Sequence, residues 1–254
     1  MKIVTAIDED FEQAFIALHN SFKKNTLLGF ELICLVYGSE AFRTRIEKRG
    51  VDVIYQPDEQ QLVEFVSEDH KSFGSIPGAS RLLIPSLFKD EERVLFVDAD
   101  SIILNSLRPF ADVNMMGNTI GCSRAMAPIY KQIPGLENTH KKTLALNCGV
   151  ILFDVQKARE ESLMEKYVLL YREVLEEGKY NISRFGLQAI MNLYHLGKFF
   201  VFPQEWQNYG QNRTPTKDTL LVHYVGFSKP WLLTIPMKNE NMRPLWWKYY
   251  ELSI

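Results

Sequence analysis

Strand patterns and helix patterns alternate along the first part of the chain, and this alternation restricts the fold more than any other feature. Apolar runs of strand length are separated by segments in which apolar residues recur at helical spacing, as Phe11, Phe15 and Leu18 do after Asp10, the expected helix cap. Such an order favours a mostly parallel sheet, because parallel neighbours need a crossover connection, usually a helix. The expected strands cover 2–7, 31–37, 51–55 and 94–97, and the expected helices follow Asp10 and cover 40–49 and 80–89.

Beyond Asp100 the pattern becomes mixed, but nothing in it marks a domain boundary. The sequence contains no internal repeat, no low-complexity tract and no linker. We therefore expect one α/β domain over residues 1–254, with a Rossmann-like, mostly parallel central sheet and helices on both faces. The remaining expected strands are 119–124, 148–154, 198–202 and 220–224, and the remaining expected helices are 155–177, 184–195 and 240–252.

Two aspartates stand at the end of an expected strand, in the run Phe96-Val97-Asp98-Ala99-Asp100. Open α/β folds bind their ligands at the carboxyl edge of the sheet. Carboxylate oxygens at that edge suit Mg²⁺ or Mn²⁺, which bridge phosphate oxygens. An Asp-x-Asp pair also occurs in ordinary turns and calcium loops, so by itself it leaves several functions open.

A second motif, His223-Tyr-Val-Gly226-Phe-Ser-Lys229-Pro-Trp231, strengthens the metal interpretation. His223 follows an apolar run and can supply a further metal ligand, although a lone histidine at a strand end more often only forms a hydrogen bond. Gly226 lets the backbone approach a phosphate closely, and Lys229 can place an ammonium on the same oxygens.

Composition limits the partners. The formal net charge of −2 and the scattered basic residues argue against nucleic acid and anionic membranes. Cys34, Cys122 and Cys148 form neither a disulfide framework nor a zinc pattern, and we interpret them as small buried hydrophobes in a reducing compartment. No apolar run approaches membrane-spanning length, and the amino terminus does not match a signal peptide. We expect a cytoplasmic protein without a membrane span.

With these motifs, the chain resembles glycosyltransferase family 8. The resemblance extends over nearly the whole length, and the most specific part is the tail motif that begins at His223. The segments that carry it are Ala6-Ile-Asp8-Glu-Asp10, Ser80-Arg81-Leu82, Phe96-Val-Asp98-Ala-Asp100-Ser, Leu146-Asn147-Cys-Gly149-Val150 and His223 to Trp231.

The resemblance implies a GT-A fold, a UDP-sugar donor bound through Mn²⁺ or Mg²⁺, and transfer with retention of configuration to a hydroxyl of a glycan, glycoprotein or glycolipid. UDP-glucose is the first candidate donor. The resemblance also assigns residues by position. Asp98, Asp100 and His223 ligate the metal, and Gly226 and Lys229 hold the β-phosphate. The remaining donor contacts are Ala6, Asp8 and Asp10 at the uridine, Ala99 and Leu187 elsewhere in the donor site, Arg81 and Asn147 at the sugar, and Gln188 beneath the anomeric carbon. Gln188, Lys229, Asn147 and Arg81 form the expected catalytic set.

One position departs from the family pattern. An Asp normally precedes the glutamine and hydrogen-bonds hydroxyls of the donor sugar, whereas Leu187 stands here. Water or another side chain substitutes for the Asp, or the donor presents less polarity at that point, as a pentose or a 6-deoxy sugar does, or UDP-glucose is bound with looser selectivity. The sequence does not identify the acceptor. We expect residues 126–143 and 205–217 to form the acceptor pocket.

Two other functions share features with this sequence. A haloacid dehalogenase-type phosphatase also carries Asp-x-Asp after an apolar strand, but Ser101-Ile102 matches that family poorly and no late acidic pair follows a strand. A protein that binds a nucleotide sugar without transferring it is the second alternative. The intact Asp98, Asp100, His223 and Lys229 argue against this alternative, and the departure at Leu187 keeps it open.

Overall fold

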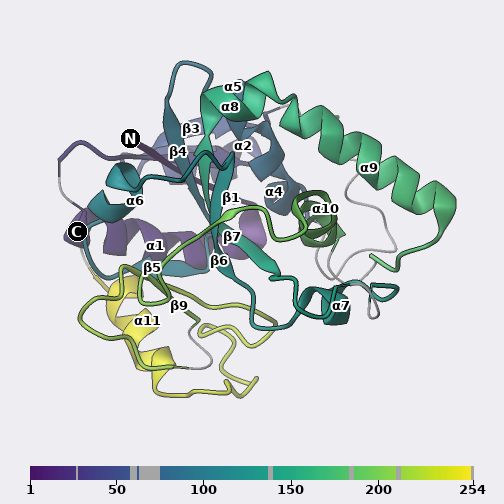
Figure 1. Ribbon diagram of the computed structural model, residues 1–254. Helices are drawn as coiled ribbons and strands as arrows, with labels where there is room; N and C mark the ends of the chain where they lie inside the picture. The colour runs from purple at the N-terminus through teal and green to yellow at the C-terminus, as the bar shows by residue number, and fades with distance from the viewer. Residues whose placement is uncertain are drawn as a thin grey trace. The chain divides into compact units, whose positions relative to one another are not determined.

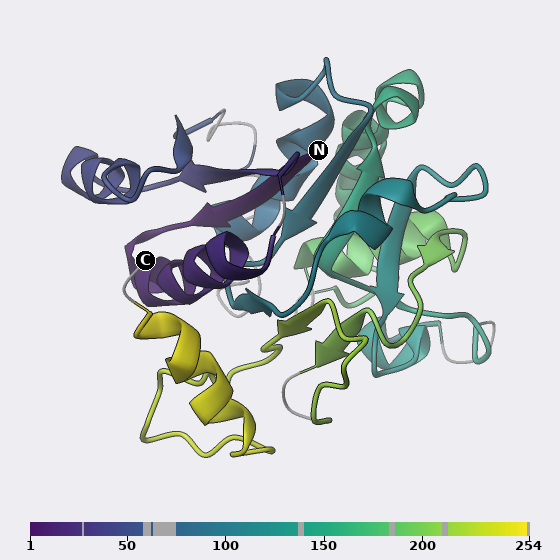
Figure 2. The same cartoon turned by 90° about the vertical axis from the view of Figure 1, so that its left-hand side faces the viewer.

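The computed structural model describes residues 1–26, 28–57, 62, 75–136, 140–182, 186–209 and 213–252. The chain divides into two compact units, and Figures 1 and 2 show the elements of both. Unit 1 comprises Met1–Tyr55, Leu95–Val113 and Phe202–Ile254, and unit 2 comprises Gln56–Val94 and Asn114–Val201. One domain over the whole chain stays a prediction.

Unit 1 contains the strand order β3-β2-β1-β4. Strand β1 pairs in parallel with β2, and β2 pairs in parallel with β3. Both β1 and β2 are apolar and buried along almost their whole length, as strands covered on two faces require. These strands and their helices are β1 (Lys2–Ile7), α1 (Glu12–Asn25), β2 (Glu31–Val36), α2 (Glu40–Glu47), β3 (Asp52–Tyr55) and β4 (Arg93–Val97), of which β4 begins in unit 2.

A second, smaller sheet of unit 1 has the strand order β5-β10-β9. Strand β10 runs antiparallel to β5 and parallel to β9. Its Val222 packs in a core cluster with Ala17 of α1, Ile102 of β5 and Trp246 of α11, and Figures 1 and 2 show α11, in yellow, beside α1, in purple. The elements of this part are β5 (Ser101–Ile103), α6 (Arg108–Asp112), β9 (Gln207–Tyr209), β10 (Leu221–His223) and α11 (Met242–Tyr250).

Unit 2 contains the strand order β7-β6-β8, in which β6 runs antiparallel to β7 and parallel to β8. Helix α10 packs against α9 and against β7. The elements are α4 (Ile76–Ala79), α5 (Ile84–Leu87), β6 (Ile120–Arg124), α7 (Ile129–Gln132), β7 (Leu146–Asp154), α8 (Val155–Glu160), α9 (Leu163–Glu177), α10 (Gly186–His195) and β8 (Phe200–Val201).

Several local expectations need correction. Asp10 does not cap the first helix, because it lies inside a 3-10 turn over Glu9–Phe11, and α1 begins only at Glu12. The helix expected over 155–177 is two helices, since Ser162 adopts a left-handed conformation with φ of 49° that no helix can continue through. The helix expected over 80–89 is a 3-10 turn over Ser80–Leu83 followed by the short α5.

The expected fold class is confirmed. The structure is α/β with predominantly parallel strand pairing and flanking helices, and among the described strands β6 with β7 and β5 with β10 pair antiparallel. Cys34, Cys122 and Cys148 are buried, as their pattern predicted. Within the described ranges, none of the helices combines the length and the apolar character that crossing a bilayer demands.

Candidate active site

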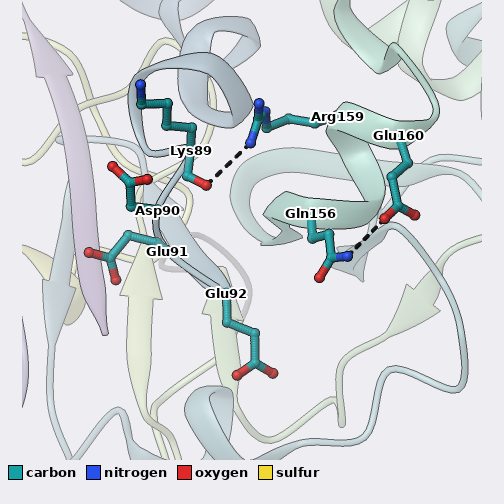
Figure 3. A pocket seen from close by; sticks show the side chains of 7 residues that line it. All are labelled: Lys89, Asp90, Glu91, Glu92, Gln156, Arg159 and Glu160. Atoms are coloured by element: carbon teal, nitrogen blue, oxygen red, sulfur yellow. Dashed lines mark hydrogen bonds between the residues drawn. The ribbon is translucent and has the colours of Figure 1, made fainter.

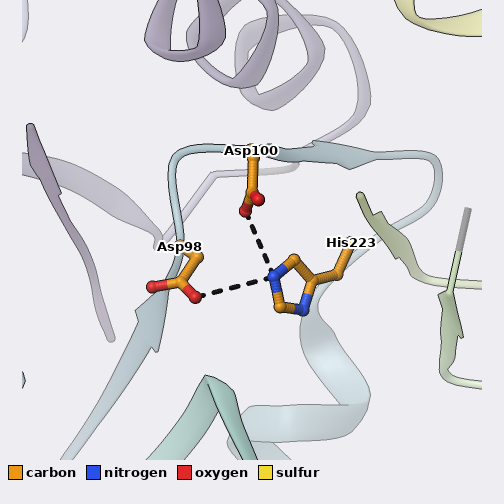
Figure 4. Close-up of side chains that lie close together, drawn as sticks. All are labelled: Asp98, Asp100 and His223. Atoms are coloured by element: carbon orange, nitrogen blue, oxygen red, sulfur yellow. Dashed lines mark ion pairs between the residues drawn. The ribbon is translucent and has the colours of Figure 1, made fainter. Parts of the chain in front are cut away.

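Two aspartates and a histidine of unit 1 converge, as Figure 4 shows. The Nε2 atom of His223 lies 3.1 Å from Oδ1 of Asp100 and 3.5 Å from Oδ2 of Asp98. One ligand atom from each residue fits within 4.8 Å of the other two. The pairing of β10 with β5 explains this convergence, because β5 begins directly after Asp100 and its Ser101 stands opposite His223.

Lys229 reaches the same group of side chains. Its ammonium donates to Oδ2 of Asp100, and it donates to the Tyr224 carbonyl oxygen at 2.7 Å. Burial raises the pKa of the Asp100 carboxyl, but Lys229 and His223 together outweigh burial and hold that pKa well below its usual range. Asp100 is therefore a buried carboxylate that keeps its negative charge at neutral pH.

The residues present fit a divalent metal. Two carboxylates and one imidazole are ligands that Mn²⁺ accepts, and the carboxylates are also suited to Mg²⁺. The Asp100 Oδ1 atom is buried and has no hydrogen-bond partner in the described part of the chain. A buried anionic oxygen without a donor is costly, and a metal ion at this point would satisfy it.

The other predicted residues of unit 1 lie in or just after β1, between the two aspartates and in the tail motif. Ala6 is buried in β1 and Ala99 is buried between the two aspartates, whereas Asp10 and Gly226 are exposed. Burial, with a smaller contribution from Asp10, raises the pKa of Asp8. Its Oδ1 atom is buried without a hydrogen-bond partner among the described residues, so Asp8 presents an unused acceptor.

Two residues that the sequence did not predict lie beside His223, away from the two carboxylates. The Gln207 Nε2 atom lies 3.4 Å from Nδ1 of His223, and the ring of Tyr209 lies 6.4 Å from the imidazole, centroid to centroid. Both residues belong to β9, inside the segment 205–217 that was expected to be an acceptor loop. Three residues are too few for strand periodicity to be recognised, so no sequence signal pointed to them.

A cluster of amides lies in unit 2 around Gln188 of α10. The Oε1 atom of Gln188 accepts from the Cys148 backbone N–H at 3.2 Å and from the Asn147 Nδ2 at 3.4 Å. The guanidinium of Arg81 donates to the Cys148 carbonyl oxygen and, at 2.6 Å, to that of Gly78. Three of the predicted catalytic residues, Gln188, Asn147 and Arg81, therefore meet at one residue of β7.

Gln132 and Asn192 support this cluster and were not predicted. The Gln132 Oε1 atom accepts from Nε2 of Gln188 at 2.9 Å, and Asn192 donates to the Gln188 carbonyl oxygen at 2.9 Å. Both supporting side chains are almost fully buried. Leu187, the residue that departs from the family pattern, is 7% exposed.

A pocket of about 620 Å³ in unit 2 contains none of the predicted residues. Figure 3 shows Arg159 donating to the Lys89 carbonyl oxygen and Gln156 donating to Glu160 in this pocket. Its lining residues are Lys89, Asp90, Glu91, Glu92, Gln156, Arg159 and Glu160. Four carboxylates against two basic groups disfavour an anionic diphosphate, so we do not assign the donor to this pocket.

The chain matches known glycosyltransferases in sequence. The family model described as Glycosyl transferase family 8 matches residues 2–234. Probable galacturonosyltransferase 14 of Arabidopsis thaliana is 27% identical over 195 residues, which cover 68% of this chain and 36% of that protein. Lipopolysaccharide 1,2-glucosyltransferase of Escherichia coli (strain K12) is 24% identical over 156 residues, which cover 55% of this chain and 44% of that protein.

Solved structures are similar over almost the whole chain. Galactosyltransferase LgtC, solved in complex with donor and acceptor sugar analogs, has a TM-score of 0.73 at 19% identity and covers 98% of this chain and 96% of its own. This likeness confirms the expected GT-A fold. The chain spans about a third of the length of the galacturonosyltransferases that it matches.

Proposed function

Because the chain belongs to glycosyltransferase family 8, we propose that it transfers a sugar from a UDP-sugar to an acceptor hydroxyl with the help of Mn²⁺ or Mg²⁺. One observation carries the proposal: Asp98, Asp100 and His223 converge within 4.8 Å, and Lys229 reaches the same carboxylate. These are the groups that a nucleotide diphosphate and its metal require. The similar proteins named above, a galacturonosyltransferase and a glucosyltransferase, support transfer of a sugar.

The proposed metal ligands and Lys229 stabilise the leaving group. Breaking the bond between the sugar and the diphosphate leaves negative charge on the β-phosphate. A metal ion held by Asp98, Asp100 and His223 supplies Lewis-acid stabilisation of that charge. Lys229 places an ammonium on the β-phosphate oxygens, and Gly226 lets the backbone approach them closely. Such contacts raise the rate because they are strongest in the transition state. Asp8 and Asp10, with Ala6, contact the uridine, and Ala99 lies in the same site.

Three of the expected catalytic residues contact the sugar in this proposal. Arg81 and Asn147 face its hydroxyls, and Gln188 lies near the anomeric carbon. The Gln188 oxygen already accepts hydrogen bonds from Cys148 and Asn147, which reduces the nucleophilicity of an amide that is a poor nucleophile to begin with. We therefore favour retention through a short-lived ion pair, in which the acceptor attacks on the face that the diphosphate leaves.

UDP-glucose remains the first candidate donor, and a pentose or a 6-deoxy sugar is the alternative suggested by Leu187. The acceptor is a hydroxyl of a glycan, glycoprotein or glycolipid. Residues 126–143 and 205–217 are proposed to bind it. The described part of these segments includes helix α7 and strand β9, and residues 137–139 and 210–212 lie outside the described residues.

Calorimetric titration with UDP tests the proposal. We expect UDP to bind more tightly with Mn²⁺ or Mg²⁺ than without, and we expect Asp100→Ala and His223→Ala to remove most of the difference. Asp112→Ala, at an exposed aspartate of α6, is the matched control and should leave the metal effect intact. Equal UDP affinity with and without metal would refute metal-assisted binding. Release of UDP from UDP-glucose in the presence of acceptor hydroxyls then separates a transferase from a protein that only binds the donor.

A further inference from the structure

The side chain of Gln207 is buried beside the proposed metal ligand His223 and has a polar atom without a partner. Gln207 is 6% exposed, and its Oε1 atom has no hydrogen-bond partner in the described ranges. Its Nε2 atom lies 3.4 Å from Nδ1 of His223. The two residues share one face of the β9–β10 pair, because Gln207 stands opposite Leu221, two residues before His223.

This geometry constrains which nitrogen of His223 carries the proton. When the Gln207 amide donates to Nδ1, that nitrogen has no proton, so the neutral ring carries its proton on Nε2. The Nε2 atom faces Asp98 and Asp100, at 3.5 Å and 3.1 Å. The same atom is the one that would bind a metal held between those carboxylates.

A metal on Nε2 requires the other tautomer. The Nε2 lone pair must then be free, and a neutral ring carries its proton on Nδ1, where it needs an acceptor. The unpartnered Oε1 of Gln207 can provide that acceptor if the amide rotates by half a turn. An amide offers both a donor and an acceptor, so the same side chain can serve both tautomers.

We propose that Gln207 is a positioning residue for the metal site: its amide holds the His223 ring in place in both states and rotates as the ring changes tautomer on metal binding. The proposal rests on the metal site of the proposed function. A leucine at this position would leave the Nδ1 proton without an acceptor in a buried place and would weaken His223 as a ligand.

Nitrogen NMR of histidine-labelled protein reads the tautomer directly, with the His223 signals assigned from a His223→Ala spectrum. At mildly alkaline pH we expect the proton on Nε2 in the metal-free protein and on Nδ1 with UDP and Mg²⁺. The same tautomer in both states would overturn the proposal, because the amide would then have no reason to rotate.

Metal affinity gives the second measurement. In titrations with Mg²⁺ in the presence of UDP, Gln207→Leu should weaken metal binding about 10- to 100-fold, the usual effect of removing an outer partner of a metal-bound histidine. Gln207→Glu keeps an acceptor for Nδ1 and should retain most of the wild-type affinity. Asn208→Leu is the matched control, since Asn208 is also a buried β9 amide with an unpartnered oxygen but points to the opposite face.

These variants separate the possible outcomes. If Gln207→Leu binds Mg²⁺ as tightly as the wild type, or if Asn208→Leu loses as much Mg²⁺ affinity, the positioning role of Gln207 is overturned while the metal site itself stands. Wild-type protein that binds no Mg²⁺ with UDP overturns the metal site and the positioning role together. A specific loss in Gln207→Leu, with a melting temperature no lower than that of Asn208→Leu, supports the proposal.

Discussion

Lys229→Met should destabilise the metal-free protein strongly, because it leaves the buried Asp100 carboxylate without its ammonium partner. The side chains of Asp100 and Lys229 are 8% and 14% exposed. Removing one member of a buried ion pair costs about 3–5 kcal/mol. His223 remains 3.1 Å from Asp100 and compensates in part, so we expect the lower end, about 3 kcal/mol. For a protein of this size that loss corresponds to a fall in melting temperature of about 6–12 °C.

Metal should reverse much of this loss. A ligand present at about 100 times its dissociation constant stabilises the native state by about 2.7 kcal/mol. In the wild type a metal must compete with Lys229 for Asp100, whereas in Lys229→Met it does not. The increase in melting temperature on adding Mn²⁺ should therefore be larger in the variant than in the wild type, while the affinity for UDP should be lower.

Thermal melts with and without Mn²⁺ measure both effects. Lys24→Met, at an exposed lysine of α1, controls for the loss of a surface charge. The double variant Asp100→Asn/Lys229→Met removes both charges and should recover part of the stability lost in the single variant. Equal melting temperatures of Lys229→Met and the wild type in EDTA, or an equal rise of both with Mn²⁺, would contradict the role given to Lys229.

Three further predictions concern other residues. Burial lowers the pKa of His195 to about 4, below its unfolded value of about 6.5. The free energy of unfolding should therefore fall by about 3 kcal/mol as the pH drops from 6.5 to 4. Urea melts should show a flatter dependence of this free energy on pH for His195→Gln. Leu187→Asp should change the ranking of UDP-glucose, UDP-galactose, UDP-xylose and a UDP-6-deoxyhexose in turnover assays, and an unchanged ranking would mean that Leu187 does not touch the sugar. NMR of the first-formed product should show retention of the anomeric configuration, and an inverted product would contradict the role given to Gln188.

The sequence predicted the fold class and most strands because the parallel strands of this protein are continuous apolar runs. Where prediction failed, local backbone geometry was the reason. The left-handed Ser162 divides a segment whose helical spacing continues across the break, and the 3-10 turn at Glu9–Phe11 displaces Asp10 from the cap position. Neither feature alters the apolar periodicity from which the helices were predicted.

The convergence of Asp98, Asp100 and His223 was predictable because each stands in a recognisable motif at the end of an apolar run. Their geometry was not, since it depends on β5, the three-residue strand that pairs with β10. Gln132 and Gln207 were missed for a related reason. Their function comes from hydrogen bonds to residues far away in the sequence, and a single glutamine leaves no pattern in its neighbours.

Gln132 and Gln207 show what these supporting positions have in common. Each is a buried amide beside a predicted site residue, Gln188 for one and His223 for the other. An amide adds no charge, so it can hold a catalytic side chain without disturbing the charge balance of the site. At His223 this matters most, because Asp98 and Asp100 already place two negative charges around the ring and Lys229 offsets one of them. A carboxylate in place of Gln207 would add a third negative charge in the absence of metal, whereas the neutral amide supports the ring in both states.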